Sequence, residues 1–179
     1  RRSVDLAKVV EAARDTVAPM AASRKVELAV SAGAPSLLTI GDPDRLQQVV
    51  WNLVSNAIRY TERGGVLLAC RAREGRVVLR VYDSGVGIAP EDRALIFDEF
   101  VRLNPKTAGD EGLGLGLSIV KRSAELLGLE VLVASRPGRG SRFDVWLPAL
   151  PEGASLFAPE SARPAASPQL EGLFVLAVD

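Results

Sequence analysis

The sequence has a single cysteine and no excess of charge of either sign, and both shortages exclude classes of protein. Cys70 stands alone within the run VLLACRA, so the chain has neither a disulfide framework nor the paired cysteines of a zinc site. We expect a buried, reduced thiol, as in a cytoplasmic protein. Lysine and arginine together number 22, as do aspartate and glutamate, so no basic excess indicates nucleic acid or an anionic membrane surface.

Long apolar runs are also missing. No run reaches the roughly 18 residues of a membrane span, and there is no signal-peptide pattern. We therefore expect no membrane contact by this chain, although a longer parent protein remains compatible with a membrane tether. The chain starts with two arginines and ends on an apolar segment, which we interpret as a fragment with one core and an appendage.

What the sequence does contain is a two-sided segment at residues 41–61, GDPDRLQQVVWNLVSNAIRYT. Asp42 suits the N-cap of a helix, and Pro43 suits its first position. At about 100° per residue, one face is apolar and carries Leu46, Val50, Leu53, Val54 and Ala57. The other face includes two asparagines, which are poor helix formers, and carries Gln48, Asn52, Asn56 and Arg59. Taken alone, this polar face is equally well interpreted as solvated or as a binding site.

The spacing of apolar residues predicts the other elements. Helices are predicted at residues 4–24, with a kink near Pro19, and at 89–97 and 115–127. Strands are predicted at residues 25–31, 37–40, 66–73, 76–82, 130–135 and 142–147. This mixture favours an α+β fold, a two-layer sandwich in which a mixed, mostly antiparallel sheet of about five strands is covered on one face by about three helices.

Three glycine-rich segments lie between these elements: DSGVGIAP at 83–90, GLGLGLS at 112–118 and PGRGSRF at 137–143. Glycine lets the backbone approach a flat ligand closely, and free N–H groups at a helix start attract phosphate. Taken alone, the first and third segments are better interpreted as ordinary turns, and the second is also consistent with a loop that only turns the chain.

Together with the polar helix face, however, the three segments resemble in order and spacing the ATP-binding domain of sensor histidine kinases. That domain belongs to the superfamily of gyrase, Hsp90 and MutL ATPases. The likeness covers about residues 4–148 and implies a Bergerat-type fold that binds ATP and Mg²⁺. The segment DRLQQVVWNLVSNAIRYT resembles the family's N box, DSGVGIAP its G1 box and IFDEF its F box. GLGLGLSIVK resembles the G2 box, and GRGSRF resembles the family's last glycine patch.

The resemblance implies roles for the polar face of the helix. Asn56 would give its side-chain oxygen to Mg²⁺, and Asn52, one turn earlier, would support the phosphates. Arg59 stands where the family commonly has lysine, which keeps the charge but alters the geometry of a phosphate contact. Asn52, Asn56 and Arg59 are the predicted catalytic residues.

The resemblance also implies contacts with the base. Asp83 would accept a hydrogen bond from the adenine amino group, Ser141 would lie beside it in a position where threonine is commoner, and Tyr60 would lie against the ring. A lid between Phe100 and Gly112 is expected to be the most mobile part without ATP. The remaining predicted nucleotide contacts are Gly85, Gly87, Ile88, Phe100, Arg102, Lys106, Gly112, Leu113, Gly114, Leu115, Gly116 and Leu117.

One departure concerns the reaction. Superfamily members that hydrolyse ATP carry glutamate where this chain has Asn52, and an amide cannot act as a general base. We therefore expect phosphoryl transfer to a histidine rather than efficient hydrolysis. The sequence contains no histidine. The expected partner is a histidine-bearing dimerisation domain, upstream in the parent or on another chain.

The end of the sequence suggests a second partner. Residues 149–169 have the composition of a linker, and LEGLFVLAVD at 170–179 resembles the first strand of a receiver domain. A plain hydrophobic terminus is an equally good interpretation. On the first interpretation the parent is a hybrid kinase with a receiver domain downstream; otherwise a separate response regulator would accept the phosphoryl group. A lone strand cannot bury itself, so we expect it to dock on this domain or on a neighbouring molecule.

Two other functions remain open on this sequence. A serine kinase of the anti-sigma-factor type would share the same boxes but act on a partner protein. A nucleotide-binding scaffold would bind ATP without transferring a phosphoryl group. Intact Asn56, Asp83 and glycine segments favour the kinase over the scaffold.

Overall fold

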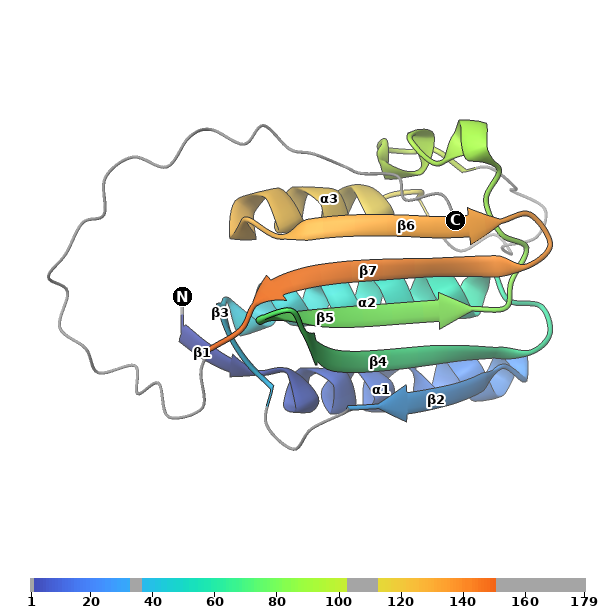
Figure 1. Cartoon of the computed structure of the whole chain (residues 1–179). Helices are drawn as coiled ribbons and strands as arrows, with labels where there is room; N and C mark the ends of the chain where they lie inside the picture. The colour runs from blue at the N-terminus through green and yellow to red at the C-terminus, as the bar shows by residue number, and fades with distance from the viewer. Residues whose placement is uncertain (1, 33–36, 103–112, 151–179) are drawn as a thin grey trace, which may run out of the picture.

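One mixed sheet and three helices make up most of the part of the chain that the structure describes. The computed structural model describes residues 2–32, 37–102 and 113–150. In order across the sheet, the strands are β2 (Glu27–Ser31), β4 (Gly65–Arg73), β5 (Arg76–Asp83), β7 (Gly140–Pro148) and β6 (Glu130–Arg136). β2 runs parallel to β4, and the other neighbours are antiparallel. One face of the sheet is covered by three helices (Figure 1): α1 (Leu6–Arg24), α2 (Pro43–Arg59) and α3 (Gly116–Leu127). This arrangement confirms the predicted two-layer sandwich.

The core lies between the sheet and the helices. Along each central strand, alternate side chains face the helices and are buried, as in β4 with Val66, Leu68 and Cys70. The whole apolar face predicted for α2 is buried against them. Burial raises the pKa of the Cys70 thiol to about 12, helped by the charge of Asp5, so the thiol stays protonated at neutral pH.

Helix α2 begins at Pro43, as the sequence predicts, and ends at Arg59, two residues before the end of the predicted segment. The Asp42 side chain accepts hydrogen bonds from the backbone of Asp44 and Arg45, which caps the helix. The hairpin between β4 and β5 turns at Glu74 and Gly75, both with positive φ, as a two-residue type I′ turn requires. The C-terminal half of α2 lies beside the end of β5 and the start of β7, because Asn56, Asp83 and Ser141 line the same cavity.

The structure corrects two element predictions. The helix predicted from residue 4 begins at Leu6, because Asp5 is its N-cap and residues Arg2–Asp5 form a strand, β1. β1 pairs antiparallel with β3, Leu38–Gly41, in a separate two-stranded sheet. The single helix predicted at 89–97 is instead two 3₁₀ turns, η1 (Pro90–Asp92) and η2 (Leu95–Phe97). α1 contains Pro19, and the kink expected there stays a prediction.

The end of the described chain packs against the small sheet. Thr39 forms a bridge with Ala149, and the backbone N–H of Leu150 donates to the carbonyl of Leu38 at 2.8 Å. The packed chain therefore continues two residues past the predicted boundary at 148. The predicted linker beyond Leu150, the receiver-like strand and its docking fall outside the described residues. No helix in the described ranges has the length and apolar character needed to cross a bilayer.

Candidate functional site

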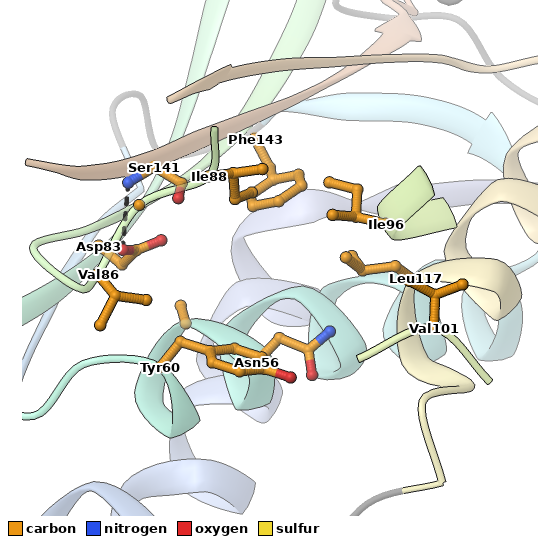
Figure 2. Close-up of a pocket in the computed structure, with 12 residues that line it drawn as sticks. Asn56, Tyr60, Asp83, Val86, Ile88, Ile96, Val101, Leu117, Ser141 and Phe143 are labelled. Atoms are coloured by element: carbon orange, nitrogen blue, oxygen red, sulfur yellow. Dashed lines mark hydrogen bonds between the residues drawn. The ribbon is translucent and has the colours of Figure 1, made fainter. Parts of the chain in front are cut away.

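A cavity of about 110 Å³ lies where the loops after β5 and before β7 meet the C-terminal half of α2 (Figure 2). Residues from six separate segments line it, and they include the polar helix and all three glycine-rich segments that the sequence singles out. The residues that line it are Asn56, Ala57, Tyr60, Asp83, Val86, Gly87, Ile88, Ile96, Val101, Leu117, Ser141 and Phe143. Most of these side chains are apolar or aromatic, so the cavity suits a flat, largely apolar ring.

Asp83 is the one carboxylate among the described residues that line this cavity. Its Oδ1 accepts hydrogen bonds from the backbone N–H groups of Gly85, at 2.9 Å, and Ser141, at 3.1 Å. Figure 2 shows its other oxygen directed toward the cavity. Burial raises the pKa of the Asp83 carboxyl, and the bonds from Gly85 and Ser141 counter part of that rise. The free oxygen is suited to accept from an N–H donor on the ligand.

Ser135 is a residue of this network that the sequence prediction missed. Its buried hydroxyl accepts from the backbone N–H of Ile88 at 2.8 Å and donates to the carbonyl of Gly140 at 2.9 Å. It also lies 3.0 Å from the hydroxyl of Ser141. The hydroxyls of Ser135 and Ser141 thus form a polar pair beside Asp83. Strand alternation turns Ser135 inward, but nothing in its sequence neighbourhood marks it.

Two glycines let the loop after β5 pass close to other backbone segments. A Cβ on Gly85 would lie 2.3 Å from the carbonyl oxygen of Tyr60. A Cβ on Gly87 would lie 2.0 Å from the carbonyl oxygen of Arg136, and the φ of Gly87 is +71°. Any side chain here would displace the loop, so these two glycines hold the cavity wall against α2 and the β6–β7 turn.

A second, more polar cavity of about 520 Å³ adjoins the first and shares Asn56, Tyr60 and Leu117 with it. It lies between the polar face of α2 and the start of α3. Asn52 is buried and donates from Nδ2 to the carbonyl of Gln48 at 2.9 Å. The amide of Asn56 has no hydrogen-bond partner in the described part of the chain, and Figure 2 shows it facing the cavity.

The start of α3 lies directly against these two asparagines. A Cβ built on Gly116 would lie 3.1 Å from Nδ2 of Asn56 and 3.3 Å from Oδ1 of Asn52. The N-cap position is Leu115, which provides no side-chain hydrogen bond. The first N–H groups of α3 are therefore left for a ligand, and the helix dipole favours a negative one.

The structure brings most of the predicted site residues to these two cavities. Arg59, Arg102 and the segment 113–117 line the second cavity. Phe100 lines neither cavity and is 67% exposed, while its backbone N–H donates to the carbonyl of Gly114. Lys106, Gly112 and the predicted mobility of the lid fall outside the described residues.

An apolar cavity with one carboxylate, joined to a polar cavity at an uncapped helix start, defines a nucleotide-binding domain. A flat base would suit the first cavity, which we call the base cavity, and phosphate groups would suit the second. The chain belongs to the family of histidine kinase-, DNA gyrase B- and HSP90-like ATPases, whose family model matches residues 41–151.

Individual relatives agree with this assignment. The chain is 40% identical over 147 residues to the sensor-like histidine kinase SenX3 of Mycobacterium tuberculosis, a match that covers 77% of this chain and 36% of SenX3. It is 40% identical over 109 residues to the sensor histidine kinase RcsC of Escherichia coli, covering 60% of this chain and 12% of RcsC. The chain thus spans only about a third or less of these relatives.

Solved structures show the same fold. Full-length ShkA in complex with AMPPNP matches with a TM-score of 0.71 and 36% identity, over 83% of this chain and 31% of ShkA. The mycobacterial sensor histidine kinase MprB matches with a TM-score of 0.68 and 28% identity, over 83% of this chain and 97% of that one. Sequence and structure together confirm the predicted likeness to the ATP-binding domain of sensor histidine kinases.

Proposed function

We propose that this domain binds ATP together with Mg²⁺ and transfers the γ-phosphoryl group to a histidine on a dimerisation domain outside this chain. The observation that carries the proposal is the contact of Gly116, at the uncapped start of α3, with the side chains of Asn52 and Asn56. Such an arrangement offers backbone N–H groups and amide oxygens to one triphosphate. Asp83 at the other end would accept from the adenine amino group.

The residues present fit a magnesium ion. Hard cations prefer oxygen ligands, and the unpaired, half-buried amide of Asn56 provides one. The described residues contain no group of three or more histidine, cysteine, aspartate or glutamate side chains suited to a metal. A metal held by Asn56 would therefore complete its shell with phosphate oxygens and water. When bound, it neutralises charge on the phosphate groups.

The lining of the cavities favours transfer over hydrolysis. Asn52 cannot take a proton from water, and Asp83 is the only carboxylate among the described residues that line either cavity. Asp83 lies at the base end, away from α3. The domain therefore positions the phosphates and stabilises their charge, with Arg59 and Arg102 beside them, and leaves the choice of acceptor to its partner.

The partners follow from the chemistry of the transfer. Since the sequence has no histidine, the acceptor belongs to a dimerisation domain upstream in the parent or in another chain. The phosphoryl group would then pass to an aspartate, either in a receiver domain beyond residue 179 or in a separate response regulator. We place this reaction in the cytoplasm, with the parent protein tethered to a membrane or free.

The test is transfer from labelled ATP to a supplied histidine-bearing dimerisation domain, with and without Mg²⁺. We expect Asn56→Ala to abolish transfer, because it removes the only side-chain oxygen proposed for the metal, while the melting temperature is kept. Gln48→Ala, an exposed change on the same helix face, is the matched control and should transfer normally.

Other outcomes would identify the alternative functions. Nucleotide binding that does not depend on metal, or metal-dependent binding without transfer to any histidine domain, would indicate a scaffold. Labelling of a serine on a partner protein would indicate a serine kinase. Unchanged transfer by Asn56→Ala would remove Asn56 from the metal site.

A further inference from the structure

A third cavity, of about 340 Å³, lies at the turn between β6 and β7 and is separate from the two described above. It borders the base cavity, because Asp83 and Ser141 line both. Four arginines line it: Arg93, Arg136, Arg139 and Arg142. Such a concentration of guanidinium groups is unexpected in a chain whose acidic and basic residues are equal in number.

Arg93 is the most unusual of the four. It follows η1, is only 8% exposed, and donates from Nη2 to the backbone carbonyl of Ser135. Its Nε is buried with no hydrogen-bond partner. Within the described ranges no carboxylate forms an ion pair with it. A buried guanidinium without a counter-charge is costly, so an anion at this place would stabilise the domain.

The nearby carboxylates do not balance the charges of Arg93, Arg139 and Arg142. Asp144, 3% exposed, lies 3.4 Å from Nε of Arg142 but is shared with Nε of Arg80 at 3.0 Å. Nε of Arg142 is itself buried and makes no hydrogen bond. Asp83 already accepts two backbone hydrogen bonds with one oxygen and directs the other toward the base cavity. The cavity therefore keeps an excess of positive charge.

We propose that this arginine-lined cavity binds a small anion of the phosphate class, free or carried as a monoester on a small molecule. Guanidinium groups match the geometry of phosphate oxygens, and several arginines favour a doubly charged ion over a single carboxylate. Tyr82 and Ser135 also line it. The site is distinct from that of the ATP phosphates, which we assign to the start of α3, on the other side of Asp83.

The experiment is a titration of the isotope-labelled whole chain with inorganic phosphate, followed through backbone amide resonances at constant ionic strength. It is run without nucleotide and again with saturating AMP-PNP and Mg²⁺. We expect the resonances of Ser135, Arg139 and Gly140 to move in both titrations, whereas any phosphate at the start of α3 is displaced by the nucleotide. Glycerol phosphate in a parallel titration distinguishes a monoester ligand from the free ion.

Two variants and one control locate the site. Arg139→Ala, an exposed change at the turn, should raise the apparent dissociation constant for phosphate about tenfold, and Arg142→Gln should do the same. Arg63→Ala removes the same charge from an exposed position outside all three cavities and should have no effect. Equal weakening in Arg63→Ala, movements confined to α3, or no movement at tens of millimolar phosphate would overturn the proposal.

Discussion

The cavity that we propose for the base is shaped at one end by the two oxygens of a single carboxylate. Oδ1 of Asp83 is held by the backbone N–H groups of Gly85 and Ser141, which fixes the orientation of the group. The other oxygen faces the cavity and is left to recognise a ligand. Burial in this apolar place raises the pKa of Asp83, so the ionised form is held at some cost in stability.

These two roles separate in the Asp83→Asn variant. The amide oxygen can still accept from Gly85 and Ser141, and the cost of burying a charge disappears, so we expect the melting temperature to stay the same or rise. The new NH₂ group would face the adenine amino group, donor against donor. ATP affinity should fall at least tenfold, whereas inosine triphosphate, which has a carbonyl there, should bind relatively better.

Calorimetric titration of both nucleotides checks this prediction, and the ratio of their affinities is the decisive quantity. A switch of preference toward inosine triphosphate would show that Asp83 reads the base. An equal loss for both nucleotides, with a lowered melting temperature, would show that Asp83 only supports the loop.

Single residues were predictable where they belong to a local motif and not where their partners are distant. Asp83 and Asn56 stand within short segments whose residue types suit a ligand. Ser135 and Arg93 act through residues 47 and 42 positions away in the chain, and only the packed sheet reveals those hydrogen bonds. Their residue types are common in ordinary turns and strands, so the sequence offers no reason to single them out.

At the scale of elements, the site that we propose for the phosphate groups depends on how the start of α3 meets α2. Glycine at the first position of α3 costs helix stability, because it has more backbone freedom to lose. It also leaves room between the helix start and the side chains of Asn52 and Asn56. Because glycine weakens the helix but leaves this room, we infer that Gly116 serves ligand binding rather than helix stability.

Gly116→Ala tests that interpretation. The added Cβ would lie 3.1 Å from Nδ2 of Asn56, which takes up space that the phosphates need. We expect ATP affinity to fall at least tenfold, while the free energy of unfolding stays within about 1 kcal/mol, because alanine favours the helix. Fluorescence-monitored nucleotide titration and urea unfolding measure the two quantities.

The matched control is Gly128→Ala, at the other end of the same helix. Gly128 has a φ of +70° and nothing within 4 Å of its added Cβ. This change should cost about 1 kcal/mol of stability, because alanine is strained in the left-handed region, but leave ATP affinity unchanged. If both variants bound ATP equally well, Gly116 would have no part in the site.

Elements were predicted well where caps and turns are explicit. Asp42 with Pro43 marks the start of α2, and Gly128 marks the end of α3. The first strand was missed because Val4 is buried at a spacing that also fits a helix, and the strand forms only through pairing with β3. The segment 89–97 is too short for its periodicity to distinguish one helix from two 3₁₀ turns.

For the whole molecule, the small sheet joins the beginning of the domain to its end. β3 pairs with β1 and also meets the chain after β7. Thr39 lies at this junction, is fully buried, and donates from Oγ1 to the carbonyl of Pro148 at 2.8 Å. We call these contacts between β3 and the chain after β7 the closure. Because they join residues about a hundred positions apart, they form only when the whole domain is folded.

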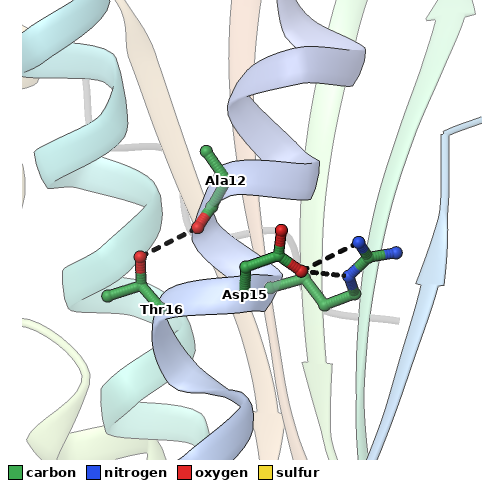
Figure 3. Close-up of polar contacts among 4 residues, drawn as sticks. Ala12, Asp15 and Thr16 are labelled. Atoms are coloured by element: carbon green, nitrogen blue, oxygen red, sulfur yellow. Dashed lines mark hydrogen bonds and ion pairs between the residues drawn. The ribbon is translucent and has the colours of Figure 1, made fainter.

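A matched pair of threonines measures how much the closure contributes. Thr16, on the exposed side of α1, also donates a hydrogen bond from Oγ1 to a backbone carbonyl, that of Ala12, at 2.9 Å (Figure 3). It lies beside the surface ion pair of Arg14 and Asp15. We expect Thr39→Val to lower the free energy of unfolding by about 1–2 kcal/mol, because a buried hydrogen bond is lost without a change of shape. Thr16→Val should change it by less than about 0.5 kcal/mol, since water replaces an exposed bond. Urea unfolding followed by circular dichroism gives both values, and equal effects would mean that the closure adds no stability beyond that of an ordinary surface contact.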